Sequence, residues 1–139
     1  METSLTWVGG AAFEGTTDSG HTITMDGPPE GGGRNLGPRP METLLLGMGA
    51  CTGYDVVSIL QKARQEVTGC RIQVSATRAE ADPKVFTEIH VRFIFKGRNL
   101  GERQIERALN LSAEKYCSAS IMLAKTARIT HSWEIDPED

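Results

Sequence analysis

The longest apolar segment of the sequence runs from Pro40 to Val67 and carries a cysteine, Cys51, near its middle. Proline suits the first turn of a helix because it has no N–H group, and Glu42 places a carboxylate at the positive end of the helix dipole. Residues 44–51 are apolar or glycine on every face, which is the pattern of a helix buried on all sides. Residues 56–67 keep only one apolar stripe along the helix. The segment therefore predicts a long central helix that leaves the core towards its end.

Three glycines lie within seven residues of this expected helix: Gly47, Gly49 and Gly53. Each of them costs about 1 kcal/mol of helix stability relative to alanine. A helix that holds three such residues together implies that another backbone comes close to it at this point. We expect that neighbour to be another helix.

Strands are expected on both sides of the central helix. Alternating polar and apolar residues predict strands, and clusters of Gly and Pro mark loops. In chain order the expected elements are strands within 4–13 and 21–25, a Gly- and Pro-rich loop at 27–39, the central helix, a hairpin of strands at 69–79 and 85–96, helices at 99–116 and 117–124, and a strand at 127–135. This order indicates an α+β fold. We expect one domain spanning residues 1–139.

The composition is that of an ordinary globular protein, with 24% charged and 39% hydrophobic residues and a net charge of −3. There is no basic block that would favour nucleic acid, no apolar run near the roughly 20 residues of a membrane span, and no signal-peptide pattern at the N-terminus. Three cysteines, an odd number, do not form a disulfide framework. We therefore expect a cytoplasmic protein without nucleic-acid or membrane partners.

Cys51 and Cys117 are the candidates for chemistry, because a thiolate is a strong nucleophile and positive or hydrogen-bonding surroundings stabilise it. Cys51 lies in mid-helix, so the support for its thiolate has to come from a cation outside that helix. Cys117 precedes a predicted helix whose first N–H groups favour a thiolate. The alternative for both is a buried cysteine that acts as a small hydrophobe. We assign that structural role to Cys70, on the apolar face of a predicted strand.

Asp55 lies one helical turn after Cys51, on the same face. A carboxylate there raises the pKa of the thiol unless it is turned towards a cation; otherwise it is a polar residue bonded to the backbone or to Lys or Arg. No metal site is expected, since His21, His90 and His131 fall on separate predicted strands and no Cys–His pair has zinc-ligand spacing. No cofactor is expected either.

The sequence nevertheless resembles a known family. The pattern P-M-E-x-L-L-x-x-x-G-x-C-x-x-x-D-V-V-x-x-L, followed by Y-C-S and a short last strand, is similar to that of the OsmC/Ohr proteins (osmotically induced protein C and organic hydroperoxide resistance protein). The second cysteine of the pattern follows the first by 66 positions. The resemblance covers essentially the whole chain. The runs LSAEKYCS and DVVSILQKARQ look closest to an OsmC-like branch of that family.

The resemblance implies an intertwined homodimer with antiparallel-rich sheets, in which the N-terminal strands of one chain join the sheet of the other. Its two central helices would pack together, which would explain the three glycines. The first and second family cysteines map to Cys51 and Cys117. In the family a hydroperoxide oxidises the first to a sulfenic acid, the second condenses with it, and a dithiol reduces the pair.

Three positions depart from the pattern of the family's peroxidases. Those proteins have an N-terminal Arg that holds the thiolate, whereas no Arg precedes Arg34 here. They have a Glu directly after the helix-starting proline, where this chain has Met41 and carries its carboxylate one residue on, at Glu42. They have Pro after the second cysteine, where this chain has Ser118. The usual activating pair is therefore absent.

Two functions are compatible with these residues. The first is a thiol peroxidase for organic hydroperoxides, in which Arg34, Arg39 or Lys115 supports the thiolate and Glu42 and Asp55 assist. In that case the Gly-rich loop at 27–39 is expected to shield or complete the site. The second is an OsmC-like protein that is not a peroxidase and binds a small apolar or electrophilic ligand in a pocket at the dimer interface.

Overall fold

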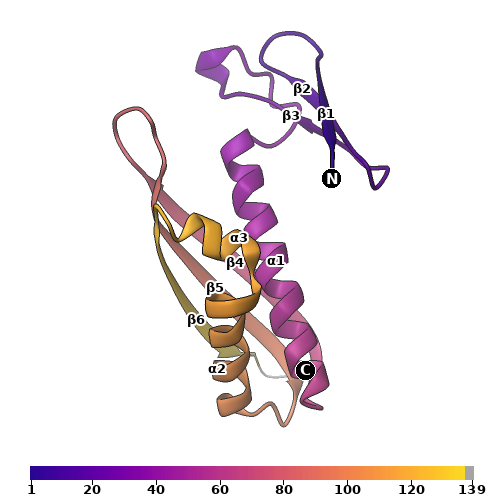
Figure 1. Cartoon of the computed structure of the whole chain (residues 1–139), viewed down its shortest axis with the longest axis vertical. Helices are drawn as coiled ribbons and strands as arrows, with labels where there is room; N and C mark the ends of the chain where they lie inside the picture. The colour runs from indigo at the N-terminus through magenta and orange to yellow at the C-terminus, as the bar shows by residue number, and fades with distance from the viewer. Residues whose placement is uncertain (137–139) are drawn as a thin grey trace. The chain divides into compact units, whose positions relative to one another are not determined.

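The computed structural model describes residues 1–136 and divides the chain into two compact units, Met1–Leu45 and the residues from Leu46 onward. Each unit contains one three-stranded sheet, with strand orders β1-β2-β3 and β4-β5-β6 (Figure 1). The predicted α+β class is confirmed, because two small sheets accompany a central helix.

The first unit is an antiparallel meander followed by an ordered loop. Its strands are β1 (Thr3–Trp7), β2 (Phe13–Thr17) and β3 (Thr22–Met25), and a single 3₁₀ turn, η1, spans Pro29–Gly31. The sequence indicated one or two strands within 4–13; the structure turns there at Gly9 and Gly10, which have φ of 102° and 53°. Positive φ favours glycine, and the turn starts β2 later than expected.

The Gly- and Pro-rich loop is organised by one carboxylate. Asp26 is buried and accepts hydrogen bonds from the backbone N–H groups of Gly27 (2.8 Å), Arg34 (2.9 Å) and Leu36 (3.3 Å). These bonds, led by the one from Arg34, hold the pKa of the Asp26 carboxyl below its usual value of 3.8. The loop is therefore folded around a charged residue that directly precedes it.

The central helix α1 spans Pro40–Lys62, as the sequence predicted. Its buried face carries Met48, Val56 and Leu60. The opposite face is open in the single chain, where Leu46 is 64% and Tyr54 77% exposed. The prediction of a helix buried on every face is thus wrong for one chain alone, because the second unit covers the helix from one side only.

Two of the three glycines of α1, Gly49 and Gly53, face the sheet of the second unit. A Cβ atom added to Gly49 would lie 3.3 Å from Cγ2 of Val74, and one added to Gly53 would lie 2.5 Å from Cδ1 of Ile72. Both contacts come from β4, so the close neighbour of these two glycines is a strand. At Gly47 a Cβ would meet no atom within 4 Å among the described residues of this chain.

The second unit places its helices on one face of a mixed sheet. The predicted hairpin is confirmed as β4 (Glu66–Arg78) and β5 (Phe86–Arg98), which pair antiparallel. The strand β6 (Arg128–Ile135) pairs with β5 in parallel, so the chain between them crosses over the sheet. Figure 1 shows α1 and α2 lying across the same face of this sheet. The core of the second unit includes Ile89, Val91, Phe93 and Phe95 of β5 and Ile105, Ala108 and Leu109 of α2.

The crossover between β5 and β6 consists of three short helical pieces. These are α2 (Glu102–Leu111), a π-helical turn η2 (Ser112–Tyr116) and α3 (Ser118–Leu123). The sequence indicated one regular helix up to residue 116; the last five residues instead form the wider π turn. Such turns are rare and are often found at functional sites.

By length and composition alone, α1 would also suffice to cross a membrane. The expectation that no apolar run comes near the length of a membrane span is therefore wrong for residues 40–62. Core helices of globular proteins pass the same test, and α1 packs Val56 and Leu60 into the core of the second unit. The helix therefore has a role in the fold that accounts for its apolar character.

Candidate functional site

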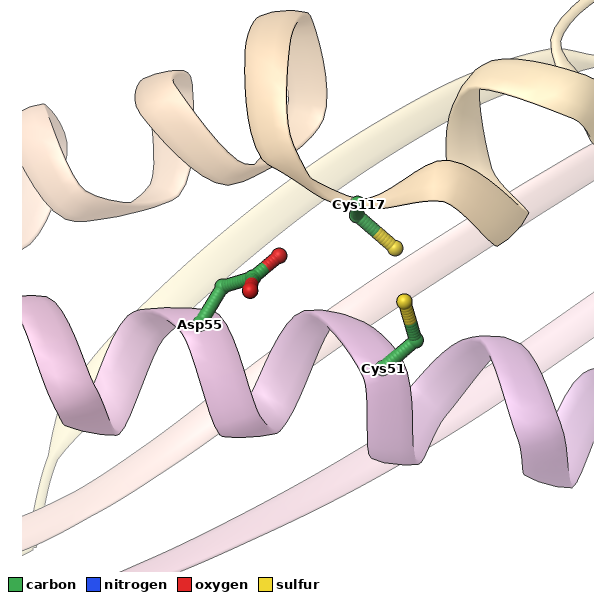
Figure 2. A group of neighbouring side chains, drawn as sticks. All are labelled: Cys51, Asp55 and Cys117. Atoms are coloured by element: carbon green, nitrogen blue, oxygen red, sulfur yellow. The ribbon is translucent and has the colours of Figure 1, made fainter.

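The structure brings Cys51, Asp55 and Cys117 together. The two Sγ atoms and a carboxylate oxygen of Asp55 all lie within 4.8 Å of one another. Cys51 and Asp55 are one turn apart on α1, whereas Cys117 comes from the junction between η2 and α3. Figure 2 shows the two sulfurs pointing towards each other across the gap between these elements, with the carboxylate beside them.

Cys117 is fully buried and caps the short helix α3. Its sulfur accepts hydrogen bonds from the backbone N–H of Ser120 at 3.3 Å and from the Ser120 hydroxyl at 3.0 Å. Burial raises the pKa of the Cys117 thiol; the two Ser120 bonds act in the opposite direction, and the neighbouring Cys51 raises it further. The predicted N–H donation is therefore present, but the expected fall in pKa is not, because desolvation outweighs it.

Asp55 is held by a chain of hydroxyl groups. The Ser112 hydroxyl donates to Oδ2 of Asp55 at 3.2 Å, and Oγ1 of Thr52 lies 2.8 Å from Oγ of Ser112. Since the single proton of Ser112 serves Asp55, the Thr52 hydroxyl donates to Ser112. From the sequence, the expected partner of Asp55 was a cation, the backbone, or a Lys or Arg side chain. The observed partner is Ser112 of the π turn.

Asp55 also lines a groove of about 490 Å³ between α1 and the α2–η2 segment. Tyr54 and Tyr116 provide aromatic walls, and Lys62 and Arg107 provide positive charge. None of these four residues is among the site candidates named from the sequence, and only the spacing of Lys62, seven residues after Asp55 on the same helix, could have indicated one of them. The groove reaches Asp55, whose carboxylate lies within 4.8 Å of the two sulfurs, while neither cysteine lines it.

The other predicted supporting residues lie in the first unit, each with a partner there. A guanidinium N–H of Arg34 donates to the carbonyl of Gly9 at 3.3 Å, and Nη1 of Arg39 donates to Oδ1 of Asn35 at 2.9 Å. A carboxylate oxygen of Glu42 accepts from the backbone N–H of Arg39 at 2.8 Å. This is half of a capping box at the start of α1, so Glu42 has a structural role in the helix terminus.

Two further residues differ from their predicted surroundings. Lys115 extends over the ring of Tyr116, with its Nζ atom 5.3 Å from the ring centroid. Cys70 pairs with Phe95 on the apolar face of the sheet, as the alternation predicted, but its side chain is exposed. The prediction that Cys70 is a core residue is therefore wrong, because β4 is an edge strand and fewer elements cover it there.

Three comparisons show what this chain is similar to. A family model described as OsmC-like protein matches residues 31–132. Protein YhfA of Escherichia coli strain K12 is 45% identical over 135 residues, which cover 97% of this chain and 98% of that protein. The crystal structure of a hypothetical protein from Aquifex aeolicus VF5 is 36% identical, with a TM-score of 0.87 over 99% of this chain and 97% of that one.

A more distant structure shares the fold. The organic hydroperoxide resistance protein OhrB of Bacillus subtilis superposes with a TM-score of 0.63 at 21% identity, covering 96% of this chain and 98% of that one.

Proposed function

This chain belongs to the OsmC-like protein family, and on that premise we propose that it is a thiol peroxidase for organic hydroperoxides that uses Cys51 and Cys117. The observation that carries the proposal is the approach of the two sulfurs to within 4.8 Å of each other. The substrate class is supported by a protein of the same fold, OhrB of Bacillus subtilis, which is called an organic hydroperoxide resistance protein.

Cys51 is proposed to react first with the hydroperoxide. Its side chain is half-buried, whereas Cys117 is fully buried and burial raises the pKa of its thiol. The Cys51 thiolate attacks one oxygen of the O–O bond, which breaks; the sulfur becomes a sulfenic acid, and the released alkoxide takes a proton to become the alcohol.

Cys117 is proposed to resolve the sulfenic acid. Its thiolate attacks the sulfur of Cys51 and displaces hydroxide, which leaves as water after protonation, so that one disulfide replaces two thiols. A disulfide needs a sulfur–sulfur distance near 2.0 Å, so the observed arrangement needs further closure. Cys117 lies between a π turn and a six-residue helix, where a small movement disturbs little regular structure. A dithiol then reduces the disulfide and returns both thiols.

The thiolate of Cys51 is proposed to be supported by two cations of the loop at 27–39, Arg34 and Arg39. Glu42 and Asp55 are proposed as assisting carboxylates. Replacing both arginines with Ala is expected to lower the thiolate fraction of Cys51, measured by the pH dependence of its alkylation. An unchanged dependence would eliminate the arginines and direct attention to Lys62 and Arg107, which line the groove next to Asp55.

We also propose that the protein works as an intertwined homodimer, that residues 1–139 form one domain, and that it resides in the cytoplasm. The exposed face of α1, with Leu46 and Tyr54, supports a partner chain, because large apolar side chains are rarely left open along a helix. Light scattering at micromolar concentration is expected to give twice the chain mass. A stable folded monomer would contradict the dimer.

The decisive experiment is turnover of cumene hydroperoxide with a dithiol. Wild type and Cys70→Ser are expected to consume peroxide, while Cys51→Ser is inactive. Cys117→Ser is expected to lose turnover and to accumulate sulfinic acid at Cys51, because no second thiol traps the sulfenic acid. Mass spectrometry after substoichiometric oxidant should place the first modification on Cys51. First modification at Cys70, or full turnover by Cys51→Ser, would refute the proposal.

A second function is favoured by the groove itself. Two tyrosines and two cations around about 490 Å³ could hold a small aromatic or electrophilic ligand without any peroxide chemistry. The same turnover assay separates the two functions. A protein that binds such a ligand near Tyr54 and Tyr116 but turns over no hydroperoxide would be an OsmC-like binding protein.

A further inference from the structure

We propose that, in the reduced protein, Cys51, Asp55 and Cys117 form a binding site for a thiophilic divalent cation, with Zn²⁺ as the fitting ion. The three side chains each offer one ligand atom, and these atoms all lie within 4.8 Å of one another. Two thiolates and one carboxylate are ligands that Zn²⁺ takes in proteins. Local sequence patterns do not indicate this site, because its two cysteines are 66 positions apart and none of its three ligands is a histidine.

The geometry is close to that of a bound ion. With Zn–S bonds of about 2.3 Å and Zn–O bonds of about 2.1 Å, the ligand atoms of a tetrahedral site are separated by about 3.4–3.8 Å. Since the ligand atoms lie within 4.8 Å of one another, binding an ion requires them to approach by about 1.0–1.4 Å at most. Closing a disulfide between the same sulfurs needs a larger movement, to about 2 Å. The reduced site is therefore closer to a metal-bound arrangement than to an oxidised one.

Two of the three ligands are already oriented by hydrogen bonds. Ser112 donates to Oδ2 of Asp55, which fixes the carboxylate and leaves its second oxygen available. Ser120 donates twice to the sulfur of Cys117, from its hydroxyl and from its backbone N–H. Metal sites commonly hold their ligands by such outer bonds, whose loss lowers affinity about 10- to 100-fold.

The site also has room for a fourth ligand. Asp55 lines the groove of about 490 Å³, and Cys51 is half-buried, so a water molecule or a small ligand can reach the ion. Three protein ligands with an open position are typical of zinc sites that do more than hold a fold together. Binding of the ion and formation of the disulfide exclude each other, because a disulfide has no thiolate to offer.

The test uses the full-length, untagged protein, reduced and freed of metal by a chelator. Titration with Zn²⁺ against a chromophoric competitor is expected to give one ion per chain. Asp55→Asn is nearly isosteric and can keep the Ser112 bond, yet it is expected to bind at least tenfold more weakly. Cys51→Ser and Cys117→Ser should weaken binding at least as much. Cys70→Ser is the matched control and should bind as wild type does.

Cobalt provides a readout that does not depend on affinity. Co²⁺ bound to wild type should show thiolate-to-metal charge-transfer absorption, reduced by about half in each single Cys51→Ser or Cys117→Ser variant. A cooperative melting transition without metal shows that Asp55→Asn folds, and Zn²⁺ should raise its melting temperature less than that of wild type and of Cys70→Ser. Charge transfer that survives in Cys51→Ser and disappears in Cys70→Ser would overturn the proposal, as would the absence of stoichiometric binding. No step of this test requires peroxidase activity, so its failure is distinguishable from failure of the proposed function.

Discussion

The hydroxyl of Ser120 donates a hydrogen bond of 3.0 Å to the sulfur of Cys117, three residues before it. The backbone N–H of the same serine donates a second bond at 3.3 Å. Both bonds stabilise the thiolate relative to the thiol, and both act against the burial that raises the pKa of Cys117. Ser120 thus lowers the pKa of Cys117 through two hydrogen bonds, against the rise that burial causes.

Ser120→Ala removes the hydroxyl bond and leaves the backbone bond. A hydrogen bond to a charged group contributes about 1.5–3 kcal/mol, and 1.36 kcal/mol corresponds to about one pKa unit. The pKa of Cys117 should therefore rise, and disulfide closure at pH 7 should slow about tenfold, with its pH profile moved to higher pH. Stopped-flow measurement of closure after a peroxide pulse gives this profile.

Ser118→Ala is the matched control for this experiment. Ser118 lies in the same short helix, but its side chain is exposed. Its replacement should leave the rate and the pH profile of closure unchanged. Equal profiles for Ser120→Ala and wild type would mean that the hydroxyl bond does not tune the thiol.

Ser112→Ala interrupts the series of hydrogen bonds that links Thr52 through Ser112 to Asp55. Ser112 is fully buried, and its loss leaves the Thr52 hydroxyl without its side-chain partner. Leaving a buried polar group unpaired costs about 1–3 kcal/mol, so urea unfolding should show a loss of that size. Adding Thr52→Val removes the orphaned hydroxyl as well. The double variant should lose less stability than the sum of the two single variants, and strict additivity would show that the two hydroxyls are not coupled.

Gly53→Ala tests the close approach of α1 to β4. The added Cβ would lie 2.5 Å from Cδ1 of Ile72, so that side chain must move. Overpacking costs about 1–3 kcal/mol, which equals or exceeds the gain of about 1 kcal/mol from replacing a helical glycine. The free energy of unfolding should fall. Combining the change with Ile72→Val should recover part of the loss, and a more stable single variant would contradict the described packing.

Gly47→Ala is the companion substitution, and it tests the dimer. Within one chain the added Cβ meets no described atom within 4 Å, so a monomer should gain about 0.5–1 kcal/mol. If a partner helix packs on this face, as proposed, the change should instead weaken the dimer. Melting temperatures measured over a range of protein concentrations should then fall most in dilute samples. A uniform gain at all concentrations would exclude helix packing at Gly47.

The carboxylate of Asp26 should make the loop at 27–39 sensitive to acid. N–H donation from Arg34, Leu36 and Gly27 lowers the pKa of Asp26 from 3.8. A carboxyl group whose pKa is lower in the folded state stabilises the fold at pH values above its unfolded-state pKa. This stabilisation is lost as the pH falls through the folded-state pKa. Hydrogen exchange at the amide of Arg34 should therefore be protected at pH 7 and lose protection well below pH 4. Asp26→Asn should expose that amide already at pH 7, and equal protection in both proteins would refute the assignment.

Local sequence patterns predicted the elements better than they predicted the site. The start of α1 at Pro40 and the hairpin of β4 and β5 follow from a helix-starting proline and from period-two alternation, which are properties of neighbouring residues. The pairing of Cys51 with Cys117 came only from family resemblance. Their approach depends on the parallel crossover between β5 and β6, which no local pattern specifies.

The polar support of the site was not predictable for a related reason. Ser112 reaches Asp55 from a π turn, and the spacing of an α-helix does not indicate where its hydroxyl points. Ser120 is the exception. Its position three residues after a capping residue is a familiar spacing for a side-chain to backbone bond, and this signal could have linked it to Cys117.

The crossover has a thermal consequence. Cys51 and Cys117 are 66 positions apart, and the chain between them includes β4, β5, α2 and η2, which is most of the second unit. A cross-link that closes a loop of that length lowers the entropy of the unfolded chain and so raises the free energy of unfolding by about 4 kcal/mol. The oxidised form would then melt on the order of 10 °C above the reduced form. Oxidation of one half-buried and one buried thiol would therefore make the protein harder to unfold.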